Sequence, residues 1–367
     1  MAQDRTPLEE HLGKMLFCGA NKKIYRNVGV QMGGSSFQDA EAQCGQSKGS
    51  YQRYKVNPAQ LVNVWDDISV FVTYDDLLKD VLMTKEMTIQ WLMKEKLISS
   101  KQNCAKCGAE MSLLECEDRS DGYRWECRKQ AGGRRHKQTL SIRKGSWFEE
   151  SNLTLEEILK HTYWWCQDLD QWQIRRQLKI NSNTAVDWDS FCRETCEVTM
   201  PQKSEKIGGP GKTVQIDESK VGKRKYHRGH RVEGQWVFGG IEEDTRKYFL
   251  VPVEDRSEAT LLPIIREWIE PGTLIVSDCW KSYSKLSENG YLHETVNHSK
   301  EFVNSNGFHT NKQEGHWRHM KTSLPIFGTR KEHFSSYLAE FMWRYKHKDS
   351  DPFKVFLRDM KALYNPN

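Results

Sequence analysis

Two apolar runs rich in β-branched residues each lead to an aspartate, and this feature constrains the fold most. Residues 214–216 lead to Asp217, and residues 274–277 lead to Asp278. Short apolar runs of this kind predict buried strands, so each aspartate is expected where its strand ends. A single aspartate at such a position is usually a cap or a turn former. Two of them, followed by Glu314 on a predicted helix, favour a site built from three carboxylates.

Three carboxylates suit hard divalent cations. Mg²⁺ prefers carboxylate oxygens and water, and a substrate phosphate completes its coordination. Two such ions, roughly 3.5–4 Å apart, can activate the attacking oxygen and stabilise the leaving oxygen in phosphodiester cleavage. Glu218 should point to the opposite face of its strand from Asp217, because strand side chains alternate. It is therefore a poor candidate for the same site.

The residues around these carboxylates predict one α/β domain, residues 212–346, in which helices pack on a mixed sheet. A glycine-rich stretch, residues 206–212, is expected to lead into the domain as a linker. A basic helix is expected over residues 309–321, around Glu314. The other expected elements are strands at 213–219, 235–243, 247–255 and 273–278, and helices at 258–269 and 333–346.

The chain outside this domain divides into segments of different character. Residues 1–70 are rich in Gln, Gly and Ser and predict a flexible leader, whereas apolar spacing predicts helices within residues 71–103. Residues 148–206 have the outline of a helix-turn-helix, with residues 181–184 as the turn and the start of a recognition helix. An ordinary helical bundle fits this segment almost as well. Residues 347–367 are expected to form a C-terminal tail.

A cysteine-rich segment, residues 104–147, predicts a zinc ribbon. Cys104 and Cys107 form a Cys-x-x-Cys knuckle followed by glycine, which can hold one side of a tetrahedral Zn²⁺. Bound Zn²⁺ would supply folding energy to a segment that lacks an apolar core. The alternative is a set of small buried thiols. The preferred partners of the knuckle are Cys127 and His136, with Cys116 as the competing ligand.

Basic residues are unevenly distributed in a chain whose net charge is only +5. Residues 128–144 contain seven Lys or Arg and no acid, and residues 220–231 contain six and no acid. Such runs are usually solvated loops, but two of them favour phosphate contacts. Residues 222–225 (GKRK) also fit a nuclear-import patch. The expected DNA-binding residues are Arg134, Arg135, Lys220, Lys223, Arg224, Lys225, Arg228, Arg318 and Lys321.

The start, MAQDRTPLEEHLGK, carries acids and lacks an apolar segment, so it does not predict a secretory signal. The ten cysteines are therefore expected as thiols or metal ligands, not as disulfides. No apolar run approaches the roughly 18 residues of a membrane span, so we expect no membrane partner.

Several long motifs occur in order over residues 216–321. They are IDESKVGKRKYHRGHRVEGQWVFGGIE, VPVEDRSEATLLPII, SDCWKSY and HTNKQEGHWRHMK. In these motifs the chain resembles the Merlin superfamily of cut-and-paste DDE transposases and its bacterial relatives with an ISXO2-like catalytic domain. The resemblance implies an RNase H-like catalytic domain in which Asp217, Asp278 and Glu314 bind Mg²⁺ or Mn²⁺. Asn311 opens the Asn-x-x-Glu motif that contains Glu314, and it is expected to contact DNA.

The resemblance implies a multidomain α+β chain with a zinc ribbon, a helix-turn-helix-like region and an RNase H-like domain. Its expected partners are transposon ends, target DNA and a second protomer, so that a dimer or higher oligomer forms on DNA. The expected location is the nucleus if the host is eukaryotic. One alternative is a transposase-derived, zinc-dependent DNA-binding protein without catalytic activity, which has no reason to keep three carboxylates in their motifs. The other, an RNase H-type nuclease acting alone, leaves the ribbon without a role.

Overall fold

The computed structural model describes residues 65, 67–131, 134–202, 205–222, 234–278, 281–296, 311–325, 331–364 and 366. These residues form two compact units, and each is described by itself. The first unit runs from Ser182 to Pro352, whereas the second combines residues up to Asn181 with residues from Phe353 onward. The protein is therefore a mixed α+β protein, as the sequence predicts. Most of the predicted leader, residues 1–64, lies outside the described residues.

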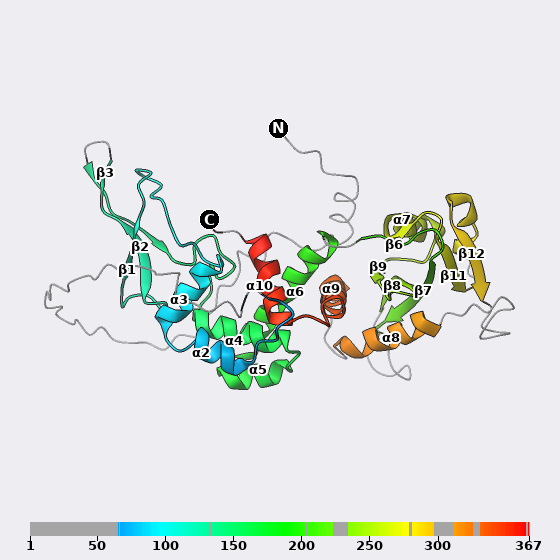
Figure 1. Ribbon diagram of the computed structural model, residues 1–367, viewed down its shortest axis with the longest axis horizontal. Coiled ribbons are helices and arrows are strands. Elements are labelled where there is room, and N and C mark those ends of the chain that lie inside the picture. The colour runs from blue at the N-terminus through cyan, green and yellow to red at the C-terminus, as the bar shows by residue number, and fades with distance from the viewer. Residues whose placement is uncertain are drawn as a thin grey trace. The chain divides into compact units, whose positions relative to one another are not determined.

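A five-stranded mixed sheet forms the centre of the first unit (Figure 1). Its strands lie in the order β12-β11-β7-β8-β9. β8 is antiparallel to both of its neighbours, whereas β11 is parallel to both of its own. All four predicted strands are present, and β12 is an addition. The strands are β7 (Thr213–Val221), β8 (Gln235–Glu242), β9 (Tyr248–Val253), β11 (Leu274–Asp278) and β12 (Leu292–Val296).

Different helices cover the two faces of this sheet (Figure 1). α7 (Glu258–Trp268) packs on one face, in a core that contains Ile216 and Phe238. α8 (Asn311–Ser323) lies against β7 and β8 and contacts Gln215. Because neighbouring side chains of a strand point to opposite faces, α8 covers the face opposite to α7.

The glycine-rich stretch expected as a linker is part of the fold, so that prediction is wrong. Within residues 206–212, β6 (Ile207–Gly208) pairs in parallel with β10 (Ile269–Glu270). The N–H of Gly208 donates to the Glu242 carboxylate at 2.7 Å. A Cβ at Gly208 would lie 2.3 Å from the Thr273 hydroxyl oxygen. Glycine is therefore required there for the close approach of two chain segments.

The second unit contains a small antiparallel sheet, with strand order β1-β2-β5, and several helices. Thr154 caps α4 in a capping box with Glu157. The elements are α2 (Tyr74–Asp80), α3 (Lys85–Lys94), β1 (Ser112–Glu115), β2 (Tyr123–Cys127), β3 (Gln130–Ala131), β4 (Arg134–Arg135), β5 (Gln138–Ser141), α4 (Leu155–Cys166) and α5 (Gln171–Leu178).

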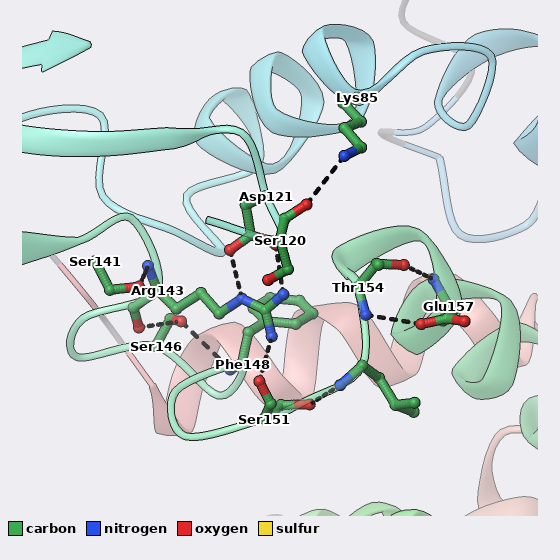
Figure 2. A network of polar contacts seen from close by, with 11 residues as sticks. Lys85, Ser120, Asp121, Ser141, Arg143, Ser146, Phe148, Ser151, Thr154 and Glu157 are labelled. Carbon is green, nitrogen blue, oxygen red and sulfur yellow. Dashed lines mark hydrogen bonds and ion pairs between the residues drawn. The ribbon is translucent and has the colours of Figure 1, made fainter. Parts of the chain in front are cut away.

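A buried ion pair joins the hairpin between β1 and β2 to the segment that leads into α4 (Figure 2). The Arg143 guanidinium donates to both carboxylate oxygens of Asp121, and both side chains are buried. The same guanidinium donates to the Ser151 carbonyl at 3.1 Å. Removing one partner would leave an uncompensated buried charge, which is strongly destabilising. The pair therefore fixes the hairpin to the start of α4.

The C-terminal segment, residues 347–367, was expected as a tail but contains the helix α10 (Pro352–Leu363). Its apolar residues recur at helical spacing and are mostly buried. The Lys354 ammonium donates to the carbonyls of Asp67 at 2.9 Å and Val70 at 2.8 Å. The expectation of a tail is therefore wrong, because this amphipathic helix buries its apolar face within the second unit.

The segment expected as a helix-turn-helix forms the three predicted helices in order, but they divide between the two units. α4 and α5 belong to the second unit, whereas α6 (Ser182–Gln202) belongs to the first. There α6 packs against α9 (Phe334–Lys346), and the Arg193 guanidinium lies over the Tyr337 ring at 4.3 Å. A DNA-binding role for residues 148–206 stays a prediction.

Candidate metal-binding cluster and active site

Three cysteines and one histidine of the ribbon come together in one cluster. Cys104 Sγ lies 3.2 Å from His136 Nε2, and Cys107 Sγ lies 3.7 Å from Cys127 Sγ. The four ligand atoms all lie within 4.8 Å of one another. Gly108, with φ +69°, turns the chain back after the knuckle. A Cys3His set of this size could bind zinc in tetrahedral coordination.

Cys116, the competing ligand, is not a member of this cluster. It lies beside Asp118. Burial raises the pKa of its thiol, and its contact with Asp118 adds to the rise. Burial also opposes ionisation of Cys104, but hydrogen bonds from the Lys106 backbone and the His136 side chain lower the pKa of Cys104 to about 6. Because the thiolate is the form that binds metal, this environment favours a metal ligand at Cys104.

The two predicted aspartates lie on neighbouring parallel strands. Asp278 ends β11, as predicted. Asp217 does not end its strand, because β7 continues to pair with β8 beyond it. Val276 pairs with Gln215, two residues before the aspartate on each strand. Since side chains two residues apart share a face, Asp217 and Asp278 both point to the face that α8 covers.

Glu314 comes to this face on α8, in the first turn of the helix. One turn further along α8, Trp317 is buried, and its indole N–H donates to Asp217 Oδ2 at 2.9 Å. Burial raises the pKa of Asp217 to about 6, and the charges of Asp278 and Glu314 contribute to the rise. The three carboxylates are thus close enough to interact electrostatically. Unlike the thiols of the ribbon, their oxygens do not gather within 4.8 Å of one another.

Glu218 lies on the opposite side of the sheet, where the alternation of strand side chains places it. It accepts a hydrogen bond from the hydroxyl of Tyr283, which is buried in the core beneath α7. Burial raises the pKa of Glu218 to about 7, although the bond from Tyr283 opposes the rise. Glu218 is therefore a buried neighbour of Asp217 that faces away from Glu314.

The exposed side of α8 carries the basic residues that the sequence pattern singles out. Arg318 and Lys321 are exposed, and both share a helix face with Glu314 by their spacing. Between them and Glu314, a Cβ at Gly315 would meet nothing within 4 Å. No described part of the protein therefore explains why residue 315 is glycine.

The buried side of α8 is anchored by aromatic contacts. The His316 ring packs edge-on against Tyr248, with 3.9 Å between ring centroids, and also contacts Phe341 and Tyr345. Burial lowers the pKa of His316 to about 4. His316 is thus a neutral packing residue at neutral pH, and the opposite side of α8 remains available to a ligand.

The other predicted DNA contacts are described only in part. The Lys220 ammonium lies 5.4 Å from the Trp236 ring, and the Arg256 guanidinium lies 4.1 Å from the same ring. Arg135 is exposed on β4. The side chains of Arg134 and Asn311 lie outside the described set, as do the whole residues Lys223, Arg224, Lys225 and Arg228.

One exposed basic surface was not singled out from the sequence. On α5, Trp172 is 52% exposed, and the Arg176 guanidinium lies 5.8 Å from its ring. Arg175 and Lys179 are also exposed, and residues 171–181 contain no acid. The lack of acidic residues over positions 171–181 was the sequence signal that could have predicted this basic surface.

The protein has two chemically different candidate metal sites. One consists of three acidic side chains near one face of the mixed sheet, and the other is the Cys3His cluster. Residues 207–346 match the family described as the ISXO2-like transposase domain. A protein named "uncharacterized transposase-like protein" from Haemophilus influenzae is 36% identical over 104 residues, which cover 28% of this chain and 84% of that protein. The chain therefore belongs to the ISXO2-like transposase family.

Membership of a transposase family implies DNA binding and the cleavage or transfer of DNA strands. The matched region contains the whole five-stranded sheet and α8, and with them all three carboxylates. Among the described helices, none is both long and apolar enough to cross a membrane.

Proposed function

We propose that this protein is a cut-and-paste DNA transposase of the Merlin superfamily, with Asp217, Asp278 and Glu314 as its catalytic triad. One observation carries the proposal. Two aspartates on neighbouring parallel strands share one sheet face, and the helix that carries Glu314 is hydrogen-bonded to that face through Trp317. The enzyme would bind transposon terminal repeats, cleave DNA and join the 3′ ends to target DNA.

The topology of the first unit supports an RNase H-like catalytic domain. Three antiparallel strands are followed by a crossover helix and then by two strands parallel to the first. This order places the strand of Asp217 at the centre of the sheet, next to the strand of Asp278. Ligands of open α/β sheets bind at the carboxyl ends of such neighbouring parallel strands.

The donor set fits hard divalent cations such as Mg²⁺ or Mn²⁺. In the metal-free protein, burial disfavours the ionised form of Asp217 and raises its pKa to about 6, and the charges of Asp278 and Glu314 add to the rise. When bound by Asp217, Asp278 and Glu314, two divalent ions would activate the attacking oxygen and stabilise the leaving oxygen. We assign Asp217 as the shared ligand because its strand, β7, lies next to the strand of Asp278 and contacts the helix of Glu314.

Basic side chains of both units would hold the DNA backbone. Arg318 and Lys321 extend from the exposed side of α8 on the face that carries Glu314, so they would contact the scissile strand. On α5, Arg175, Arg176 and Lys179 would bind phosphates of the transposon end, with Trp172 against the sugars. Such contacts produce a steep salt dependence of binding, and the loss of one contact reduces its slope by about 1.

The Cys3His cluster would hold a structural Zn²⁺ that orders the ribbon for recognition of the transposon end. Pairing of two transposon ends would require at least two protomers on DNA, and the residues 222–225 would direct the protein to the nucleus of a eukaryotic host. The competing function is a transposase-derived DNA-binding protein without catalysis. The shared face of Asp217 and Asp278 favours the enzyme, since binding alone needs no carboxylates near DNA.

The deciding experiment is a cleavage and strand-transfer assay with the full-length protein and DNA that carries candidate terminal repeats. A transposase will cut at the repeats and join the new 3′ ends to a target plasmid only when Mg²⁺ or Mn²⁺ is present. Sequence-specific binding without cleavage under all metal conditions would establish the DNA-binding alternative. Cleavage without preference for the repeats and without joining would establish an RNase H-type nuclease.

A further inference from the structure

The helix α8 meets β7 through two hydrogen bonds that differ from the apolar packing elsewhere on the sheet. The side-chain oxygen of Gln215 accepts from the backbone N–H of Gln313 at 3.1 Å. Asp217 accepts from the Trp317 indole at 2.9 Å. Each bond joins the strand that carries one predicted metal ligand to the helix that carries another.

The spacing of these two bonds fixes the register between strand and helix. Gln215 and Asp217 are two residues apart on one face of β7, which corresponds to about 6.6 Å. Gln313 and Trp317 are four residues apart on α8, which corresponds to about 6 Å along the helix axis. A shift of α8 by one residue, or a rotation about its axis, would therefore break both bonds together.

The side chain of Gln215, on β7, caps the first turn of α8. The first N–H groups of a helix have no partner within the helix, and Gln313 belongs to this first turn. Gln215 is fully buried, and its amide N–H₂ donates to the Glu243 carboxylate at 2.5 Å. The Lys312 ammonium of α8 donates to the Glu243 carbonyl at 3.1 Å. The orientation of the Gln215 oxygen toward α8 is thus itself held in place.

The sheet surface beneath α8 is shaped for this close approach. Gly239 lies opposite Asp217 in the pairing of β7 with β8, and so it shares the face that α8 covers. A Cβ at Gly239 would lie 3.0 Å from the side-chain nitrogen of Gln313 and 2.7 Å from Leu250. The absence of a side chain at this position allows the first turn of α8 to lie directly on the strands.

We propose that Gln215 and Trp317 are positioning residues, which hold Glu314 at a fixed place relative to Asp217 and so preorganise the three carboxylates for divalent cations. The inference rests on the proposed function, because it assumes that these carboxylates bind the catalytic ions. Trp317 fixes the Oδ2 atom of Asp217, and thereby the orientation of this carboxylate. Preorganisation of this kind matters because small displacements of ligands weaken metal sites.

The test compares Mn²⁺ binding by the full-length, zinc-loaded protein and its variants, measured by electron paramagnetic resonance without DNA. Trp317→Phe removes the indole donor but keeps an aromatic ring, and Gln215→Met removes the acceptor but keeps an unbranched chain. Each is expected to weaken Mn²⁺ binding about tenfold, the effect of losing one hydrogen bond to a charged or capping group. The concentration of Mg²⁺ needed for half-maximal DNA cleavage should rise by a similar factor.

Matched controls separate positioning from general loss of stability. Trp268→Phe makes the same change on the opposite face of the sheet, where Trp268 stacks on Phe249. Gln235→Met removes a buried amide whose hydrogen bonds go to backbone carbonyls of β8 and β9. Both controls should change the melting temperature without changing Mn²⁺ affinity by more than about twofold, because neither contacts a carboxylate of the site.

The outcomes distinguish this inference from the proposed function. Unchanged Mn²⁺ affinity in both Trp317→Phe and Gln215→Met, with a lowered melting temperature, would show a purely structural role and overturn the inference. A wild-type protein that binds Mn²⁺ in a manner dependent on Asp217, but never cleaves DNA, would overturn the proposed function and leave the positioning role intact. If either variant fails to fold, the remaining one decides by the same comparison.

Discussion

The Cys3His cluster and the three-carboxylate site are assembled in opposite ways. The four ligands of the cluster lie within residues 104–136, in one short segment of the chain, and their ligand atoms lie within 4.8 Å of one another. The carboxylates come from two strands and a helix, at positions 217, 278 and 314, and are held less closely. The first arrangement could surround an ion completely, whereas the second would leave room for substrate and water.

This difference reflects the chemistry of the two ligand sets. Four soft ligands satisfy Zn²⁺ without help, so a structural zinc site is closed and contributes directly to folding. Three carboxylates leave coordination positions for a phosphate. Burial disfavours the charge of Asp217, with a smaller contribution from Asp278 and Glu314, and a bound cation would offset this cost. With zinc bound, the ribbon would therefore stabilise the fold as a crosslink does. The carboxylate site, in contrast, has an unfavourable electrostatic energy that should destabilise the metal-free fold. Each prediction below tests one side of this contrast.

The largest effect is expected on the closed site. Cys127→Ser should remove bound zinc and unfold residues 104–141, because structural Zn²⁺ supplies on the order of 10 kcal/mol to such segments. Zinc content per chain and hydrogen exchange of the ribbon measure the two consequences. Cys116→Ser is the control, since Cys116 lies outside the cluster, and it should retain one zinc per chain. Loss of zinc in the control instead would contradict the assigned ligand set.

A smaller but still severe effect is expected on cleavage at the open site. Asp217→Asn, Asp278→Asn and Glu314→Gln should each reduce cleavage by at least about a thousandfold, because each removes a charged ligand of the catalytic ions. Single-turnover cleavage measures the loss, and gel-shift assays should show that DNA binding is largely retained. Asp244→Asn alters an exposed acid as a control. Retained cleavage in any one of the three variants would remove that residue from the triad.

The unfavourable electrostatic energy of the carboxylate site should appear as a pH-dependent stability. The pKa of Asp217 lies at about 6 in the folded protein, above its usual value of 3.8. Because the folded state holds this proton more tightly, the metal-free protein should lose stability as pH rises from about 4 to 6. Asp217→Asn should then be more stable than the wild type at pH 7, by roughly 3 kcal/mol at most, since one pKa unit is worth about 1.4 kcal/mol.

Chemical denaturation at pH 4 and pH 7, without Mg²⁺ or Mn²⁺, measures this difference. The advantage of Asp217→Asn should disappear near pH 4, where the wild-type carboxyl is protonated, and should shrink when Mn²⁺ is added. A variant less stable than the wild type at pH 7 would show that the hydrogen bond from Trp317 outweighs the cost of burying the Asp217 charge near Asp278 and Glu314. The proposed contrast would then be wrong, because the Asp217 carboxylate would stabilise the fold, as the zinc ligands of the ribbon are expected to do.

The smallest predicted effect concerns Gly315. Gly315→Ala should stabilise the protein by about 1 kcal/mol, because alanine is the better helix former and its Cβ meets no described neighbour. Thermal unfolding measures the change. If DNA approaches α8 closely at this position, the same variant will lose cleavage activity despite its greater stability. Full activity would show that residue 315 does not lie against the substrate.

Much of the sheet could be predicted from the sequence because its strands are apolar and β-branched. The runs before Asp217 and Asp278 identified their strands, and strand alternation correctly separated Glu218 from Asp217. The position of Asp217 within β7 was not predictable, since the length of that strand depends on its pairing with β8. The short strand β6 was not predictable for a similar reason. In the sequence alone its glycine indicates a turn, whereas in the structure close packing against Thr273 requires glycine at position 208.

The ligands of both candidate sites were accessible to sequence reasoning, whereas their supports were not. Chemistry restricts metal ligands to a few residue types, and their motifs mark them. Gln215 and Trp317 carry no such mark, because a glutamine in a strand and a tryptophan in a helix are ordinary core residues. Their roles depend on which helix face meets which strand face. That relation is tertiary and spans about a hundred residues of chain.

The placement of α10 has a consequence for how the polypeptide reaches its folded state. The second unit is discontinuous: its helical and ribbon segments precede the first unit, but Phe353 and the residues after it complete the second unit. During synthesis the ribosome must therefore release the entire first unit before Lys354 can meet the carbonyls of Asp67 and Val70. Until then, the early part of the chain emerges with its apolar surface only partly covered. Complete folding of the second unit is thus delayed until the last residues of this helix leave the exit tunnel.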